Sequence, residues 1–125
     1  MTTRSADFPA MPSSVASARR MVSDAVAAFG LRELDDRAEL LASELVTNAV
    51  RHARGPVRVS ASHRRDRTIT VTVCDRASTL PTLERGDRSD GHGRGLQIVD
   101  AMSHRWGVER RGSGKCVWFE LDSAY

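Results

Sequence analysis

Apolar residues recur at two different spacings along this chain, and the order of those spacings limits the fold more than any other feature. A helical period runs through residues 12–30, returns from Asp36 to about Ala53, and is expected once more from about Gly95 to His104. Elsewhere apolar and polar residues alternate, as they do in strands with one buried face. The chain must therefore pack helices against a sheet.

Four segments have strand character: residues 56–64, 68–75, 104–111 and 116–122. Short connections join them in pairs, so we expect two antiparallel hairpins. A further short strand is expected from Arg4 to Phe8, where Pro9 stops it. Strands paired in this way predict an α+β two-layer sandwich, in which a mixed, mostly antiparallel sheet is covered on one face by three helices.

Local signals mark the ends of the first two helices. Ser13 or Ser14 can cap the start of the first helix, and Gly30 can end it. Asp36, with Glu39 three residues later, resembles a capping box that opens the second helix. Residues 31–36, LRELDD, are expected to connect the two helices.

Length and composition bound the class of protein. At 125 residues and 13.7 kDa, residues 1–125 form one domain with enough chain for a core of its own. Only 5% of the residues are aromatic, so we expect aliphatic side chains and alanine to fill that core. No window approaches the run of about 18 apolar residues that a membrane helix needs. The first residues show no apolar signal segment, so the expected compartment is the cytoplasm.

The net charge of +3 is mildly basic. A basic chain can bind nucleic acid or an anionic ligand. Here the arginines are scattered, and no basic stripe with interleaved aromatic residues is present. We therefore expect a solvated basic surface and no direct contact with nucleic acid.

The two cysteines, Cys74 and Cys116, each lie inside an apolar segment of strand character. The chain has no CxxC motif and no His/Cys spacing typical of a zinc site. Buried, reduced thiols are therefore expected.

The second helix carries three polar residues in a row, Glu44, Asn48 and His52. On a helical wheel, Glu44 and Asn48 fall at the border of the apolar arc, and His52 falls slightly inside it. One interpretation is a surface Glu beside a hydrogen-bonded Asn. The other is a carboxylate and an amide oxygen presented together to a hydrated cation or phosphate. The second suits magnesium, which prefers oxygen ligands and keeps most of its waters, and the Glu could take a proton from a hydroxyl.

A glycine-rich segment precedes the third helix. Residues 76–94 have no hydrophobic period, and Gly91, Gly93 and Gly95 alternate at their end. Glycines before a helix let the backbone approach an anion, which the free amides and the helix dipole attract. A flexible linker is the alternative, and Arg94 is either a phosphate neighbour or solvent-facing. No GK[ST] follows, so this is not a Walker A loop.

Asp75 ends the strand-like segment 68–75. An Asp in such a position is most often a turn former. It can instead accept a hydrogen bond from an exocyclic amine, such as that of adenine.

In this order and spacing, ELVTNAVRHA, the strand ending VCDR and the segment GHGRGLQIVD resemble the GHKL superfamily of ATPases and kinases. The small single-domain size is similar to the anti-sigma factor serine/threonine kinases of that superfamily. The resemblance extends from about Phe8 to Leu121, nearly the whole chain. It implies the Bergerat ATP-binding fold.

The resemblance also implies a role for each polar signal. Asn48 would ligate Mg²⁺ bridging the phosphates of ATP, and Glu44 would be the general base or a water-orienting group. Asp75 would bind the adenine amino group. The start of the third helix would contact ATP through Gly93, Arg94, Gly95 and Leu96. Residues 80–94 would form the ATP lid.

The chain departs from the family directly after Asp75. The usual glycine box, D-x-G-x-G, reads DRAST here, with Ala77 and Thr79 at the glycine positions. A β-carbon at each position restricts the backbone. This difference bears on ATP affinity and turnover.

The preferred hypothesis is an anti-sigma factor that uses ATP and Mg²⁺ to phosphorylate a serine or threonine of an anti-sigma factor antagonist, and so controls a sigma factor. The resemblance also implies a homodimer. The alternative is a non-catalytic, ATP-dependent protein-binding module, which the altered glycine box favours. A histidine-kinase ATPase domain fits less well, because the chain is too short to include a helix pair with a phosphoacceptor histidine.

Overall fold

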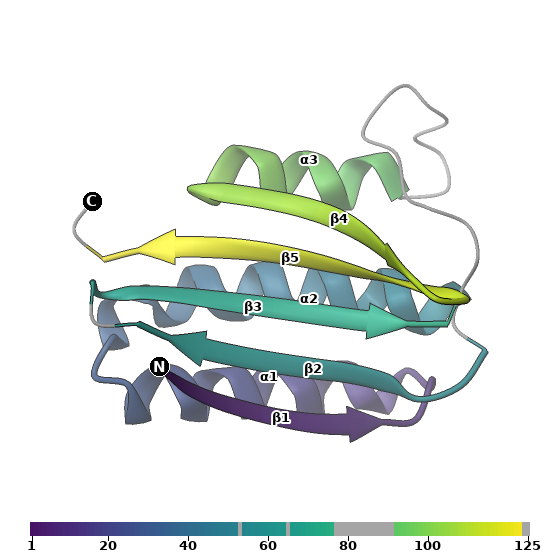
Figure 1. Ribbon diagram of the computed structural model, residues 1–125, viewed down its shortest axis with the longest axis horizontal. Coiled ribbons are helices and arrows are strands. Elements are labelled where there is room, and N and C mark those ends of the chain that lie inside the picture. The colour runs from purple at the N-terminus through teal and green to yellow at the C-terminus, as the bar shows by residue number, and fades with distance from the viewer. Residues whose placement is uncertain (53, 65, 77–91, 124–125) are drawn as a thin grey trace.

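The structure is a computed structural model that describes residues 1–52, 54–64, 66–76 and 92–123. Within these residues a five-stranded sheet has the order β1-β2-β3-β5-β4, and three helices lie along one of its faces (Figure 1). The strands are β1 (Thr2–Phe8), β2 (Val57–His63), β3 (Thr68–Asp75), β4 (Arg105–Arg111) and β5 (Gly114–Asp122). The helices are α1 (Ser13–Ala28), α2 (Asp35–His52) and α3 (His92–Met102).

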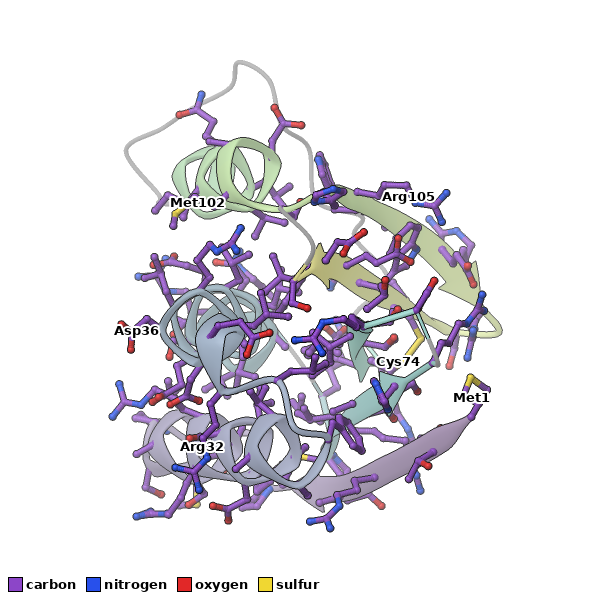
Figure 2. The ribbon with its side chains drawn as sticks, turned by 90° about the vertical axis from the view of Figure 1, so that its left-hand side faces the viewer. Met1, Arg32, Asp36, Cys74, Met102 and Arg105 are labelled. Carbon is purple, nitrogen blue, oxygen red and sulfur yellow. A yellow bond between two sulfur atoms is a disulfide. The ribbon has the colours of Figure 1, made fainter. Side chains whose placement is uncertain are left out.

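This architecture confirms the predicted two-layer α+β sandwich, and every strand pairing in the sheet is antiparallel. Figure 2 shows the helices on one side and the sheet on the other. Successive side chains of a strand point to opposite faces, and the face toward the helices is buried. Its residues are Val57, Val59, Ala61, Ile69, Val71, Val73, Val117, Phe119 and Leu121.

Aliphatic side chains fill the space between the two layers. Val22 and Val26 of α1, Leu41 of α2 and Leu96 of α3 are each at most 1% exposed. Each such side chain contributes roughly 1.5–3 kcal/mol when it leaves water. Among the described residues, Phe119 is the largest fully buried side chain and the one aromatic member of this core. Aliphatic side chains and alanine therefore fill the core, as the low aromatic content of the chain predicts.

The ends of α1 match the prediction at one end only. The helix begins at Ser13, but no side chain caps it, because the Ser14 hydroxyl donates to the carbonyl oxygen of Pro9 at 2.6 Å. The predicted serine cap is therefore wrong. Gly30 follows the helix with a φ of 75°, a conformation that glycine adopts at no steric cost, and so ends it as predicted.

The start of α2 differs from the prediction. A 3₁₀ turn (Arg32–Leu34) leads directly into the helix, which begins at Asp35. Burial of Leu34 draws this turn into the core, so Asp36 lies within the first turn of α2 and does not cap it. The capping-box prediction is therefore wrong.

Helix α3 begins and ends earlier than predicted. It starts at His92, three residues before Gly95, and ends at Met102. After it, the backbone N–H of His104 donates to the carbonyl oxygen of Glu120 at 2.8 Å, which brings the chain into the sheet. None of the described helices combines the length and apolar character needed to cross a bilayer.

Candidate functional site

The middle of α2 presents Glu44 and Asn48 where the prediction put them. Both side chains are partly exposed, beside the buried Leu45 and Ala49. They therefore lie at the border of the helix face that packs on the core. His52 differs from the prediction, because it is the last residue of α2 and is exposed.

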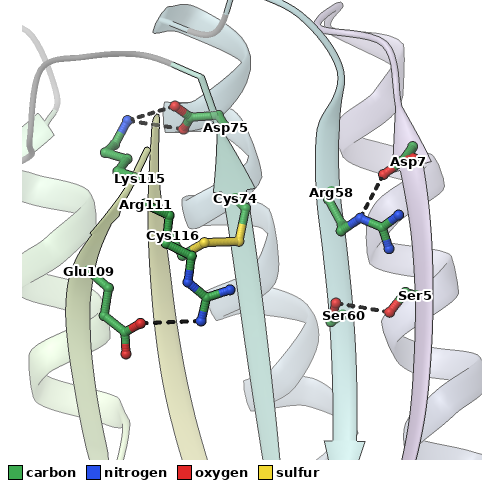
Figure 3. The surroundings of a disulfide bond; sticks show 10 residues. All are labelled: Ser5, Asp7, Arg58, Ser60, Cys74, Asp75, Glu109, Arg111, Lys115 and Cys116. Carbon is green, nitrogen blue, oxygen red and sulfur yellow. Dashed lines mark hydrogen bonds and ion pairs between the residues drawn. A yellow bond between two sulfur atoms is a disulfide. The ribbon is translucent and has the colours of Figure 1, made fainter. Parts of the chain in front are cut away.

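At the end of β3, Asp75 forms a buried ion pair with Lys115 of β5 (Figure 3). The ammonium Nζ of Lys115 donates to both carboxylate oxygens of Asp75, at 3.1 Å to Oδ1 and 3.0 Å to Oδ2. The two side chains are only 8% and 2% exposed. Removing one partner of such a pair leaves an uncompensated buried charge and costs about 3–5 kcal/mol.

Sequence reasoning missed Lys115, although a signal for it exists. Lys115 has the same strand phase as the buried Val117 and Phe119, so it lies on the core face of β5. Asp75 has the same phase as the buried Val73 on β3, and the register places it opposite Lys115. Two opposite charges at core-facing positions of paired strands predict an ion pair, because burying a single charge without a partner costs too much free energy.

Gly114 lets β5 begin close against the end of β3. A Cβ built on Gly114 would lie 2.0 Å from the carbonyl oxygen of Asp75. Only a residue without a Cβ fits this approach. The glycine therefore sets the position from which the next residue, Lys115, reaches the carboxylate.

The first turn of α3 contains three of the predicted phosphate-binding residues, Gly93, Arg94 and Gly95. Backbone N–H groups of a first turn have no partner within the helix, which keeps Gly93 available as an amide donor. Leu96, the next predicted contact, is buried at 1% exposure and anchors α3 to the core. Most of the predicted lid, residues 80–91, lies outside the described residues, and residues 92–94 are helical.

The elements that carry these residues pack together. Helix α2 packs against both α3 and β3, so the three elements that carry the predicted residues are joined through α2. A further hydrogen bond fixes α3, since Trp106 Nε1 of β4 donates to Asp100 Oδ1 at 2.7 Å. The fold therefore brings the predicted elements together.

The cysteines differ from the prediction, because Cys74 and Cys116 form a disulfide. They are opposite each other in the register of β3 and β5, one residue from the Asp75–Lys115 pair and on the other face of the sheet (Figure 3). Sequence alone did not reveal the pairing, because it depends on the register between strands that are far apart along the chain.

The first turns of α2 hold an acidic cluster, Asp35, Asp36 and Glu39, whose carboxylate oxygens lie within 4.8 Å of one another. Burial raises the pKa of Glu39, and a hydrogen bond with Asp35 raises it further. Arg19, at 3.7 Å from Glu39, acts in the opposite direction. We assign no ligand to this cluster.

Comparison with protein-family models identifies the family. The model of the histidine kinase-like ATPase domain matches residues 8–121, nearly the whole chain. The chain therefore belongs to the histidine kinase-like ATPase domain family. A comparison with curated proteins found no match.

Solved structures show the same fold. The catalytic domain of the histidine kinase ThkA, in a nucleotide-free form, has a TM-score of 0.59 at 15% identity, with 96% of each chain covered. Full-length ShkA in complex with AMPPNP has a TM-score of 0.61 at 22% identity, with 84% of this chain covered. The histidine kinase domain of the blue-light activated kinase EL346 from Erythrobacter litoralis has a TM-score of 0.58 at 23% identity, with 93% covered. This chain spans 29% of the ShkA chain and 62% of the EL346 chain.

Proposed function

We propose that the chain binds ATP through residues of α2, the end of β3 and the first turn of α3. The observation that carries this proposal is the position of Asp75, which is buried at the end of β3, a strand that packs against α2, in a chain of the ATPase-domain family. Its carboxylate would accept a hydrogen bond from the exocyclic amine of adenine. Gly93 would offer its backbone amide to the phosphates, beside Arg94 and Leu96, while Gly95, without a Cβ, would leave room for them along the first turn of α3.

The donor set on α2 fits a magnesium ion. Asn48 offers an amide oxygen at a partly exposed position, and Mg²⁺ prefers oxygen ligands while it keeps several waters. Asn48 would therefore hold the ion, which when bound neutralises charge on the phosphates. Glu44, one turn earlier on the same face, stays available for proton transfer.

The activity we propose is that of a serine/threonine protein kinase of the anti-sigma factor type. Glu44 would accept the proton of a serine or threonine hydroxyl of an anti-sigma factor antagonist as that hydroxyl attacks the γ-phosphate. The same chain would bind a sigma factor, act in the cytoplasm and form a homodimer. The support is the single-domain size and the motif order of the sequence.

A second candidate is an ATP-dependent binding module without phosphotransfer. One observation favours it, namely that Lys115 occupies both oxygens of Asp75, so that adenine must share the carboxylate with an ammonium group. Ala77 and Thr79, at the glycine positions of the family's first glycine box, favour weak binding as well.

Titration calorimetry with ATP, with and without Mg²⁺, tests the nucleotide site. We expect binding that Mg²⁺ strengthens, and we expect Asn48→Ala to remove mainly the magnesium-dependent part. Thr47→Ala, on the neighbouring position of α2, is the matched control. An Asn48→Ala protein with unchanged magnesium dependence would remove Asn48 from the site, and the absence of ATP binding in the wild type would end the proposal.

Transfer from ATP labelled at the γ-phosphate to purified candidate antagonists separates the two functions. For the kinase we expect labelled antagonist with the wild type and none with Glu44→Ala, while both proteins still bind ATP. A wild type that binds ATP and its antagonist but never transfers label would support the binding module.

A further inference from the structure

A basic groove of about 440 Å³ lies at the end of the sheet where β3 ends and β5 begins. The Cys74–Cys116 disulfide forms part of its wall, together with Arg58, Arg76 and Arg111. Cys74 is partly exposed, whereas Cys116 is only 2% exposed. The disulfide is therefore placed at a surface groove and not within the hydrophobic core between the layers.

The charges around the groove favour an anion. Arg58, opposite Cys74 in the register, pairs with Asp7 at 3.2 Å, and Arg111 pairs with Glu109 at 3.2 Å. Arg76 is exposed and has no ion-pair partner within the part of the chain that the structure describes. It therefore adds one uncompensated positive charge.

Lys115 and Asp75, which also line the groove, neutralise each other. The net field of the groove is therefore positive. A positive field attracts anionic reactants and stabilises a thiolate relative to a thiol.

We propose that the Cys74–Cys116 disulfide is a thiol-exchange site that reacts with a small anionic thiol entering this groove. The thiolate is the nucleophile in such exchange, and access to a sulfur atom determines where it attacks. Cys74 is the more exposed partner, so its Sγ is the point of attack.

The reaction needs two thiol molecules. The first thiolate forms a bond to Cys74 Sγ, the Cys74–Cys116 bond breaks, and the Cys116 sulfur leaves as a thiolate and takes up a proton. A second thiolate then attacks the sulfur of the bound small molecule and releases Cys74. In total two small thiols are oxidised to their disulfide, and the protein disulfide is reduced to two thiols.

The sheet does not depend on the disulfide for its pairing. Strands β3 and β5 pair from Thr68–Asp122 to Asp75–Lys115, and the buried ion pair joins their ends on the other face. Opening the disulfide therefore leaves the two strands paired. Reduction and oxidation can then occur in the folded protein, as a reversible site requires.

The test compares three small thiols on folded protein purified without reductant: mercaptopropionate (anionic), mercaptoethanol (neutral) and cysteamine (cationic). Mass spectrometry after rapid alkylation measures the rate of exchange at equal thiolate concentrations. We expect the anionic thiol to react about threefold faster than the cationic one at low salt, and high salt to reduce the difference. The first adduct is expected on Cys74.

Arg76→Gln is expected to bring the three rates closer together. Arg20→Gln, an exposed arginine on α1, is the matched control and is expected to leave them unchanged. Two free thiols in protein kept under air, exchange only after unfolding, or equal rates for all three thiols would each overturn the proposal.

Discussion

At the scale of single residues, Asp75 and Lys115 are the two charged residues that are buried in the described part of the chain. Both side chains are nearly inaccessible, and each is the other's counter-ion. Lys115→Ala would leave the carboxylate buried without its cation. We expect a loss of about 3–5 kcal/mol in the free energy of unfolding, measured by urea denaturation near neutral pH.

The double variant Asp75→Asn with Lys115→Met is the control for this prediction, because it removes both charges. We expect it to be more stable than Lys115→Ala alone. Equal losses in the two proteins would show that packing, and not the unpaired charge, accounts for the effect.

A second prediction at this scale concerns Gly114. Its alanine variant places a Cβ 2.0 Å from the carbonyl oxygen of Asp75, so the backbone of β5 must move. We expect Gly114→Ala to lower the free energy of unfolding by about 3 kcal/mol or more, beyond usual overpacking. Gly55→Ala is the control, since its Cβ would meet only the Arg76 side chain at 3.6 Å. A Gly114→Ala protein as stable as that control would contradict the observed approach of the strands.

At the scale of elements, the start of α2 makes stability depend on pH. The pKa of Glu39 is raised in the folded protein, first by burial and then by Asp35, so folding favours the protonated acid. This contribution to stability is fully present below the ordinary pKa of 4.5 and is lost as pH rises through the raised value. Glu39→Gln has no such dependence.

We therefore expect the free energy of unfolding of Glu39→Gln, relative to the wild type, to increase as the pH rises from 4 toward 7. Urea denaturation at a series of pH values measures this difference. Glu109→Gln, on the exposed face of β4, is the control for removal of one surface carboxylate. A constant difference across the series would show that Glu39 titrates alike in the folded and unfolded chain.

Most elements could be predicted because burial imposes a period on the sequence. The alternation around Val57 and Val71 identified β2 and β3, and the helical period around Leu41 and Leu45 identified α2. The start of α3 could not be predicted as well, because glycine-rich sequence has no apolar period before Leu96. The hydrophobic period shows which face of an element is buried, but it says little about the residue at which the element begins.

The site was predictable only in part for a related reason. Glu44, Asn48 and Asp75 belong to single elements, so the sequence around each indicated its face. The contacts of Asp75 with Lys115, and of Cys74 with Cys116, depend on the register of strands that are about forty residues apart. Register becomes known only when the sheet is assembled.

At the scale of the whole molecule, the two layers form one core, so a ligand that binds the folded state stabilises the entire domain. ATP with Mg²⁺ at 100 times its dissociation constant would add about 2.7 kcal/mol. For a domain of this size we expect an increase in Tm of roughly 10 °C, measured by thermal denaturation. Asp75→Asn would reduce that increase, because the adenine amine loses a charged acceptor, while Asp24→Asn, an exposed residue on α1, would not. Equal increases in both variants would place the base of the nucleotide away from the end of β3, and no increase in the wild type would contradict ATP binding itself.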